Sequence, residues 1–291
     1  MTKNNSDEEN QAKKQTNSIF EQNTQIQTGL DNILGDKEAA LMMAAPYKPA
    51  QVSPGRSISP NIGKSEEKYI EKAIKSVEAD NLKLNINSPG GSVSSSYKIA
   101  KSLVEIFEDI EVYVPHYAKS GGTLISLAGD EIVMGMMSEL GPLDPQYTDS
   151  SGETHSATTY IEAYDNTIER LSRIHPQDAS MASQAEYSEL DPVKRKEMGN
   201  AKEMMEKYGK DILSQHEFSD EEVEDAINYF LEDSPSHTHS YCVMYDEAAE
   251  KLPNSMVLRE EERQEEMDVM SSWFGAYSSR GNNDHWIKIY E

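Results

Sequence analysis

The chain has 291 residues, enough for one domain of about 200 residues with appendages or for two small domains. Its 27 Lys and Arg residues stand against 52 Asp and Glu residues, which gives a formal net charge of −25. This balance excludes the basic surface by which proteins usually bind nucleic acids or anionic membranes, and we interpret the acidity as a well-solvated surface.

A single cysteine, Cys242, leaves no partner for an intrachain disulfide and no cysteine cluster for a metal ion. The histidines His237 and His239 are too few for a metal site, so we expect neither a metal nor a cofactor. The first residues lack the apolar stretch of a signal peptide, and no run of about 18 apolar residues occurs. The sequence therefore predicts a soluble, cytoplasmic protein without membrane or nucleic-acid partners.

Residues 1–45 predict a polar N-terminal tail. Apolar residues recur weakly at helical spacing over residues 18–34, and the apolar run from Glu38 to Ala45 predicts one further helical turn. Four prolines fall between residues 46 and 60, which argues against a central strand there, because proline lacks the N–H that a sheet needs.

Regular structure is expected from Ser65, an N-cap residue followed by two glutamates. From there helical and strand patterns alternate with short links. The expected helices cover residues 65–80, 92–107 and 124–128, and the expected strands cover residues 82–86, 110–114 and 132–134. This order predicts an α/β fold with right-handed crossovers and a parallel sheet.

Two glycine turns lie where predicted strands end. The first is Pro89-Gly90-Gly91, and the second is Lys119-Ser120-Gly121-Gly122. Ligands bind at the carboxyl ends of parallel strands, and a glycine turn that leads into a helix presents free backbone N–H groups. The N–H groups of Gly91 and Gly121 are therefore candidate donors to an oxyanion beside Ser120. The plainer reading is that Ser120 only caps the following helix and that the glycines only permit tight turns.

A serine that acts as a nucleophile needs three further groups. A base must take the hydroxyl proton, a carboxylate should hold that base, and two preorganised donors should bind the oxyanion. Each such donor typically stabilises the transition state by about 3 kcal/mol.

Several segments resemble a known family. NSPGGS (87–92), VPHYAKSGGTLISLAGDEIVMG (114–135) and LGPLDPQ (140–146) resemble the Clp-protease/crotonase superfamily, and more closely the serine dehydrogenase proteinase family, which is related to signal peptide peptidase A. HSYCVMYDEAAEKL (239–252) is similar to that family's terminal His-containing turn and the helix after it. The resemblance implies a Clp/crotonase-like sheet of strand–turn–helix units, with Ser120 as nucleophile and Gly91 and Gly121 as oxyanion donors.

The resemblance leaves the base open. Clp proteases carry a histidine shortly after the nucleophile, whereas no histidine occurs here from Gly121 through Thr154. The serine dehydrogenase proteinases imply the chain order Ser, Asp, His, which favours His239 as base and Asp144 as the orienting carboxylate. Both have plainer readings, His239 as a solvated loop residue and Asp144 as a turn residue before Pro145. The alternative bases or orienting groups are His116, Lys119 and Asp130.

The sequence departs from the family pattern in three places. Ser240-Tyr241-Cys242 replaces the expected Asp-Tyr-Pro, Lys119 replaces an apolar residue before the nucleophile, and the proline-broken segment 46–63 replaces a regular first strand and glycine turn.

The predicted organisation is a polar tail over residues 1–45, a peptidase domain over residues 46–252 and an extension over residues 253–291. Within the domain, residues 158–232 predict polar helices that cover the site or build homo-oligomers. Three functions remain open: an ATP-independent serine peptidase acting on peptides or unfolded proteins, a catalytically silent scaffold, and a crotonase-type acyl-CoA enzyme, which would need the oxyanion donors but no nucleophile.

Overall fold

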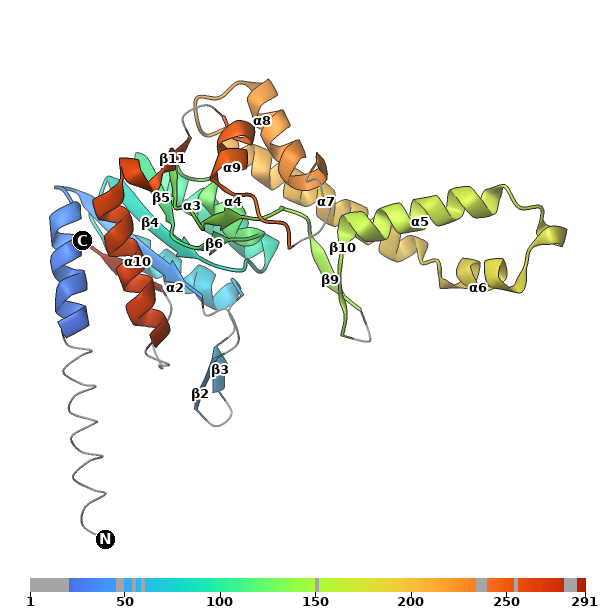
Figure 1. Ribbon diagram of the computed structural model, residues 1–291, viewed down its shortest axis with the longest axis horizontal. Helices are drawn as coiled ribbons and strands as arrows, with labels where there is room; N and C mark the ends of the chain where they lie inside the picture. Colours follow the sequence, from blue (N-terminus) through green and yellow to red (C-terminus); the bar gives the residue numbers. More distant parts are fainter. Residues whose placement is uncertain are drawn as a thin grey trace, which may run out of the picture.

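The computed structural model describes residues 21–45, 50–53, 56–58, 61–149, 152–233, 240–253, 256–279 and 287–291 (Figure 1). Its centre is a six-stranded sheet with the strand order β11-β7-β5-β4-β1-β12. Five of these strands run parallel, and β12 pairs with β1 in the antiparallel direction. The predicted α/β fold with a mainly parallel sheet is thus confirmed. The strands are β1 (Glu38–Ala44), β4 (Asn81–Asn87), β5 (Asp109–Val114), β7 (Glu131–Met134), β11 (Val257–Arg259) and β12 (Ile287–Tyr290).

Helices cover both faces of the sheet. The strand residues alternate between them, so that in β1 Leu41 and Met43 belong to one core and Ala40 and Met42 to the other. The first core is covered by α2 (Lys64–Ile74), α3 (Val93–Ile106), α4 (Gly121–Ser126), the end of α7 (Pro192–Leu213), α8 (Asp220–Asn228) and α9 (Tyr245–Lys251). The second core is covered by the helix of residues 21–33 and by α10 (Gln264–Ser279).

Short strand pairs extend from this body. They are β2 (Ala50–Ser53) with β3 (Arg56–Ile58), β6 (Tyr117–Ala118) with β8 (Glu139–Leu140), and β9 (Gln146–Thr148) with β10 (Thr154–Ser156). The β6–β8 pair lies next to the second glycine turn, and the β9–β10 hairpin leads into α5 (Ala157–Ser172).

The apolar run at residues 38–45 forms β1, so the expected helical turn is wrong. Residues 39–44 are all fully buried, because β1 pairs with β4 on one side and with β12 on the other. A strand that is buried on both faces reads as a continuous apolar run, and periodicity alone cannot distinguish it from a buried helical segment.

The sheet also extends beyond the predicted limits of the peptidase domain. β1 lies within the predicted tail, and β11 and β12 lie within the predicted extension, yet all three are strands of the central sheet. The expected N-cap at Ser65 is wrong by two residues: Gly63 occupies the N-cap position of α2, and its N–H donates to Glu66 Oε2 at 2.9 Å.

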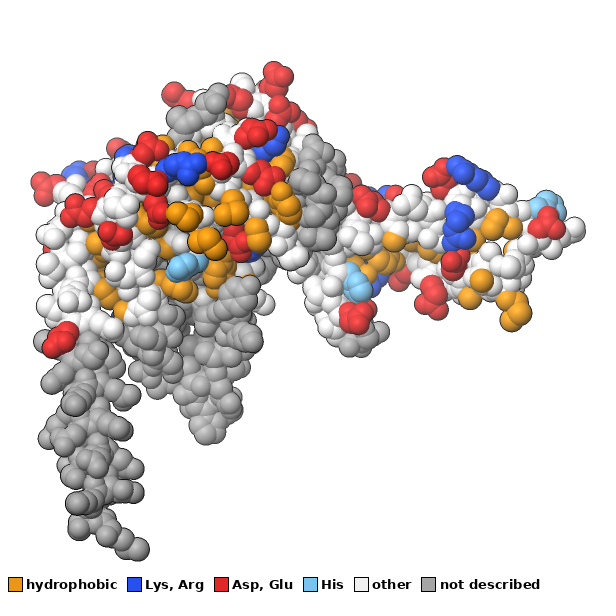
Figure 2. All heavy atoms as spheres, viewed as in Figure 1, with side chains coloured by type: hydrophobic (Ala, Val, Ile, Leu, Met, Phe, Trp, Pro, Cys, Tyr) orange, Lys and Arg blue, Asp and Glu red, His pale blue; other side chains and the backbone are white. Residues whose placement is uncertain are grey.

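An arm of helices projects from the body (Figure 1). It consists of α5, α6 (Met181–Glu189) and the first half of α7. No residue of α6 is buried, and the buried residues of α7 begin only at Met205. Exposed apolar side chains of the arm include those of Met181, Tyr187 and Val193. Figure 2 shows acidic side chains spread over the visible face of the body, in keeping with the expected solvated surface.

The burial of β1 predicts a large loss of stability on truncation of its side chains. Leu41→Ala should lower the free energy of unfolding by about 2–5 kcal/mol, because Leu41 is fully buried between two strands. Met137→Ala, at a side chain that is 76% exposed, should change it by less than about 0.5 kcal/mol. Urea unfolding followed by circular dichroism measures both; equal effects would contradict a central position for β1.

Candidate active site

The two glycine turns lie side by side at the carboxyl ends of β4 and β5. The first turn follows β4, and the second follows the short strand β6, which continues from β5. Backbone hydrogen bonds join them: Ser88 N donates to Tyr117 O at 3.0 Å, and Lys119 N donates to Ser88 O at 2.9 Å. The expected meeting of the turns at one edge of a parallel sheet is therefore what the structure has.

Glycine is required in the first turn for two reasons. Gly90 and Gly91 have φ angles of +96° and +154°, which residues with a side chain rarely adopt. A Cβ on Gly90 would lie 2.9 Å from Gly121 N and from Ser120 Cβ, and a Cβ on Gly91 would lie 2.3 Å from Ile62 O. The backbones of the two turns thus pack without room for a side chain between them.

Ser120 has a strained backbone conformation. Its φ of 50° and ψ of −116° place a residue with a side chain where glycine is usually found, at a typical cost of about 1–3 kcal/mol. The helix α4 begins at the next residue, and Ser120 occupies its N-cap position without a capping hydrogen bond from its side chain. Helix capping therefore does not account for this serine.

The two proposed oxyanion donors are close together and available. Among the described residues, neither Gly91 N nor Gly121 N donates to a protein acceptor. A Cβ on Gly121 would lie 3.4 Å from Gly91 N and 2.2 Å from the hydroxyl of Ser96. Ser96 is fully buried, and its Oγ has no hydrogen-bond partner within the part of the chain that the structure describes.

Asp144 lies after β8, at the root of the arm. It is 4% exposed, and its Oδ1 accepts hydrogen bonds from Thr158 N at 3.1 Å and Thr158 Oγ1 at 2.9 Å, in the first turn of α5. These bonds join Asp144 to the start of α5, 14 residues later, and they hold the carboxylate in place.

His239 lies outside the described residues, but the chain that follows it is well placed. Val243 and Leu140 exchange two backbone hydrogen bonds of 2.9 and 3.0 Å. Leu140 in turn pairs with Ala118, two residues before Ser120. The segment from Ser240 to Val243 therefore runs next to β8, which pairs with the strand that leads to Ser120.

Two of the alternative residues have other surroundings. The His116 ring packs on Phe274 of α10, with 4.9 Å between ring centroids, and partial desolvation lowers its pKa. Asp130 precedes β7, at the opposite end of the sheet from Ser120, where it accepts hydrogen bonds from His216 Nδ1 at 3.1 Å and from Ile110 N at 2.8 Å. Burial acts to raise the pKa of Asp130, but these two bonds bring it below its usual value. The third alternative, Lys119, directs its ammonium toward Glu139 and Tyr241.

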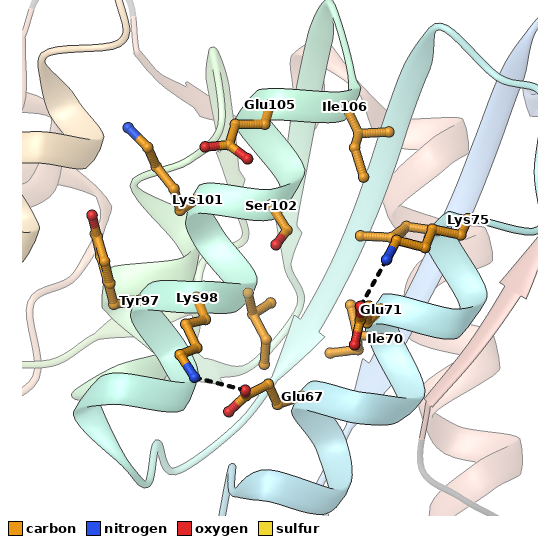
Figure 3. Close-up of a pocket in the computed structure, with 12 residues that line it drawn as sticks. Glu67, Ile70, Glu71, Lys75, Tyr97, Lys98, Lys101, Ser102, Glu105 and Ile106 are labelled. Carbon is orange, nitrogen blue, oxygen red and sulfur yellow. Dashed lines mark hydrogen bonds and ion pairs between the residues drawn. The ribbon is translucent and has the colours of Figure 1, made fainter.

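The hollow of about 430 Å³ between α2 and α3 does not belong to this site. Figure 3 shows that charged side chains line it, with ion pairs Lys98–Glu67 and Lys75–Glu71. Hydrogen bonds from Lys64 and Lys98 lower the pKa of Glu67 to about 2.

On the β9–β10 hairpin, Asp149, Glu153 and His155 bring ligand atoms within 4.8 Å of one another, and Asp149 is paired with His155 at 2.9 Å.

Residues 58–171 match the family of ClpP-like SDH-type serine proteinases. This match confirms the resemblance to the serine dehydrogenase proteinases, and it includes both glycine turns, Ser120 and Asp144. No helix among the described residues has both the length and the apolar character that crossing a membrane requires.

Two uncharacterized proteins of Methanocaldococcus jannaschii share part of this sequence. One is 48% identical over 83 residues, and the other is 42% identical over 91 residues. These regions cover 28% and 31% of this chain, and 28% and 30% of the two relatives. Among solved structures, a mutant of the 1510-N membrane-bound stomatin-specific protease aligns with a TM-score of 0.45 and 14% identity, over 71% of this chain and 79% of that one.

Sequence reasoning did not identify Ser96, Glu139 or Tyr241 as part of the site. Ser96 stands in a run of serines that reads as the polar start of a helix, and nothing in its spacing indicates contact with Gly121. Glu139 and Tyr241 both contact Lys119, and the available signal was that Lys119 stands before Ser120 where the resembled family has an apolar residue.

The contact between Gly121 and Ser96 predicts a suppressor pair. Gly121→Ala should lower the free energy of unfolding by about 1–3 kcal/mol, because the new Cβ would overlap Ser96 Oγ. Ser96→Ala removes that oxygen, which has no partner to lose, and should restore most of the stability in the double variant. Urea unfolding of the four proteins measures this; additive losses in the double variant would contradict the contact.

The strain at Ser120 predicts that glycine is more stable there than alanine. Ser120→Gly relieves the positive φ, whereas Ser120→Ala keeps it, so the glycine variant should be more stable by about 1 kcal/mol after the entropy that glycine gains in the unfolded chain is subtracted. Thermal unfolding compares the two variants. A more stable alanine variant would show that the backbone at Ser120 is relaxed.

Proposed function

We propose that this chain is an ATP-independent serine peptidase that hydrolyses peptides or unfolded protein segments through an acyl-enzyme on Ser120. The observation that carries the proposal is the strained backbone of Ser120, at a turn between a strand and a helix and against the Gly90-Gly91 turn. Such a turn presents a nucleophile above the end of a sheet, beside free backbone N–H groups. A crotonase-type enzyme would also use these N–H groups, but it needs no nucleophile, so that function does not account for a strained backbone at a serine.

The proposed reaction has two steps. Ser120 Oγ attacks the substrate carbonyl carbon while His239 takes the hydroxyl proton, and the oxyanion accepts hydrogen bonds from Gly91 N and Gly121 N. The intermediate expels the amine, which takes the proton from His239. A water molecule then attacks the acyl-enzyme by the same route and releases the acid and Ser120.

His239 is proposed as the base because the segment that follows it in the chain is bonded to the residue before Ser120. The carbonyl of Tyr241, two residues later, accepts a hydrogen bond of 3.1 Å from the ammonium of Lys119, the residue before the nucleophile. Asp144 is proposed as the carboxylate that orients the imidazole. Its burial and its bonds from Thr158 hold the carboxyl group in one orientation, as this role needs.

We further propose that the protein is cytoplasmic and forms homo-oligomers through the arm. The apolar side chains of α5, α6 and the first half of α7 are only partly covered in the single chain, and Met181 is 88% exposed. Helices with an uncovered apolar stripe gain stability by packing on another copy. The acidic net charge of −25 supports the absence of nucleic-acid and anionic-membrane partners.

Labelling with a fluorophosphonate tests the proposal. Wild type should become covalently labelled, and Ser120→Ala should not, because the reagent phosphonylates an activated serine held beside an oxyanion site. His239→Ala should lower the labelling rate by about 10³-fold, and Asp144→Asn by less. Folding of each variant is checked by circular dichroism.

The outcomes separate the alternatives. No Ser120-dependent labelling of folded wild type between pH 6 and 9 would overturn the peptidase proposal and favour the silent scaffold. Labelling of wild type that is unchanged in His239→Ala would leave the nucleophile in place and overturn the assignment of the base.

A further inference from the structure

Lys119 joins two separate segments of the chain, β8 and the segment after Ser240, through its ammonium group. Its Nζ lies 3.0 Å from Glu139 Oε1, 3.1 Å from Tyr241 O and 3.4 Å from Cys242 Sγ. Two N–H donors of the ammonium bond to Tyr241 O and Cys242 Sγ, and its charge is paired with the Glu139 carboxylate. These contacts direct the side chain toward β8 and the segment after Ser240.

The environment of this ion pair makes its geometry matter. The side chain of Lys119 is 15% exposed and that of Glu139 is 23% exposed. Partly desolvated charges are stable only if their partners are held in place, and removal of one partner leaves the other uncompensated. The stem of Lys119 also runs against Gly141, where an added Cβ would lie 2.7 Å from Lys119 Cδ. The path of the side chain is thus fixed by the backbone beside it.

Both ends of Lys119 are tied to elements of the proposed machinery. Its backbone N–H donates to Ser88 O in the first glycine turn, at 2.9 Å. Its ammonium donates a hydrogen bond to the backbone carbonyl of Tyr241. The side-chain hydroxyl of Tyr241 donates to Glu247 of α9 at 3.0 Å. Tyr241 is therefore fixed from two sides, by α9 and by the residue next to the nucleophile.

We propose that Lys119 is a positioning residue that holds the Tyr241–Cys242 segment, which follows the proposed base in the chain, beside the nucleophile turn. The inference rests on the proposed function, in which His239 is the base. It also explains two departures from the family pattern together, because Lys119 and Cys242 are in contact with each other. Lys119 acts through the segment it holds and does not itself take the proton of Ser120.

A double-mutant cycle on fluorophosphonate labelling tests this role. Lys119→Met keeps the length of the stem and removes the ammonium, and it should lower the labelling rate of Ser120 at least 10-fold. Combined with His239→Ala, it should lower the rate no further than His239→Ala alone, since a displaced base and an absent base are equivalent. Lys75→Met is the matched control, because Lys75 is 64% exposed and pairs with Glu71 on α2; its labelling rate should equal that of wild type.

The thiol of Cys242 supplies a readout that does not depend on activity. A hydrogen bond to Glu139 and burial raise the pKa of Cys242, whereas Lys119 acts to lower it. Because Cys242 is the only cysteine, the pH dependence of alkylation by iodoacetamide reports on this thiol alone. The midpoint of that dependence should move to higher pH in Lys119→Met and to lower pH in Glu139→Gln.

Glu139→Gln also serves as a second variant if Lys119→Met fails to fold. It removes the ion-pair partner of Lys119 and leaves Lys119 and Ser120 themselves unchanged. Like Lys119→Met, it should lower the labelling rate. Wild type that is not labelled at all overturns the proposed function. If Lys119→Met and Glu139→Gln are labelled at the wild-type rate, the role of Lys119 is overturned. It is also overturned if the two losses in labelling rate multiply in the Lys119→Met/His239→Ala double variant.

Discussion

The close backbone contact between the two glycine turns is the constraint on which the candidate site depends. Lys119 N bonds to Ser88 O, and Gly90 packs so tightly against the second turn that an added Cβ would lie 2.6 Å from Lys119 O. Only turns without side chains come this close, and only parallel neighbouring strands deliver both turns to the same edge. The positions of Gly91 N and Gly121 N therefore follow from sheet topology combined with glycine sterics.

The strain at Ser120 is balanced by the structure around it. The serine follows β6, which is paired with β8, and α4 begins at once with a hydrogen bond from Leu124 N to Ser120 O. Residues 121–126 of α4 are all buried, so the helix cannot shift to relax the turn. A local cost of this kind persists only where the surrounding packing determines the backbone.

The rest of the chain extends this centre on two sides. The second core lies on the face of the sheet that is covered by the helix of residues 21–33 and by α10. At one edge of the sheet, β1 pairs with β12, a strand from the other end of the sequence. The β9–β10 hairpin follows Asp144 and leads into the arm, and the Asp144 carboxylate accepts hydrogen bonds from the first turn of α5. The proposed orienting carboxylate and the proposed contact surface are therefore mechanically connected through a single helix start.

The sequence alone determined the parallel sheet, both glycine turns and the position of Ser120 in the second turn, because these depend on local periodicity and on glycine where strands end. It did not determine that residues 38–44 form a central strand, since an apolar run acquires a strand's pairing only from its neighbours β4 and β12. Nor did it indicate that Lys119 would meet Glu139 and Tyr241, or that Ser96 would lie against Gly121. Those contacts join residues 20 to 122 positions apart, and such separations are set by how the whole chain packs. The tertiary structure alone decided them, because burial and pairing are properties of the fold and not of any one segment.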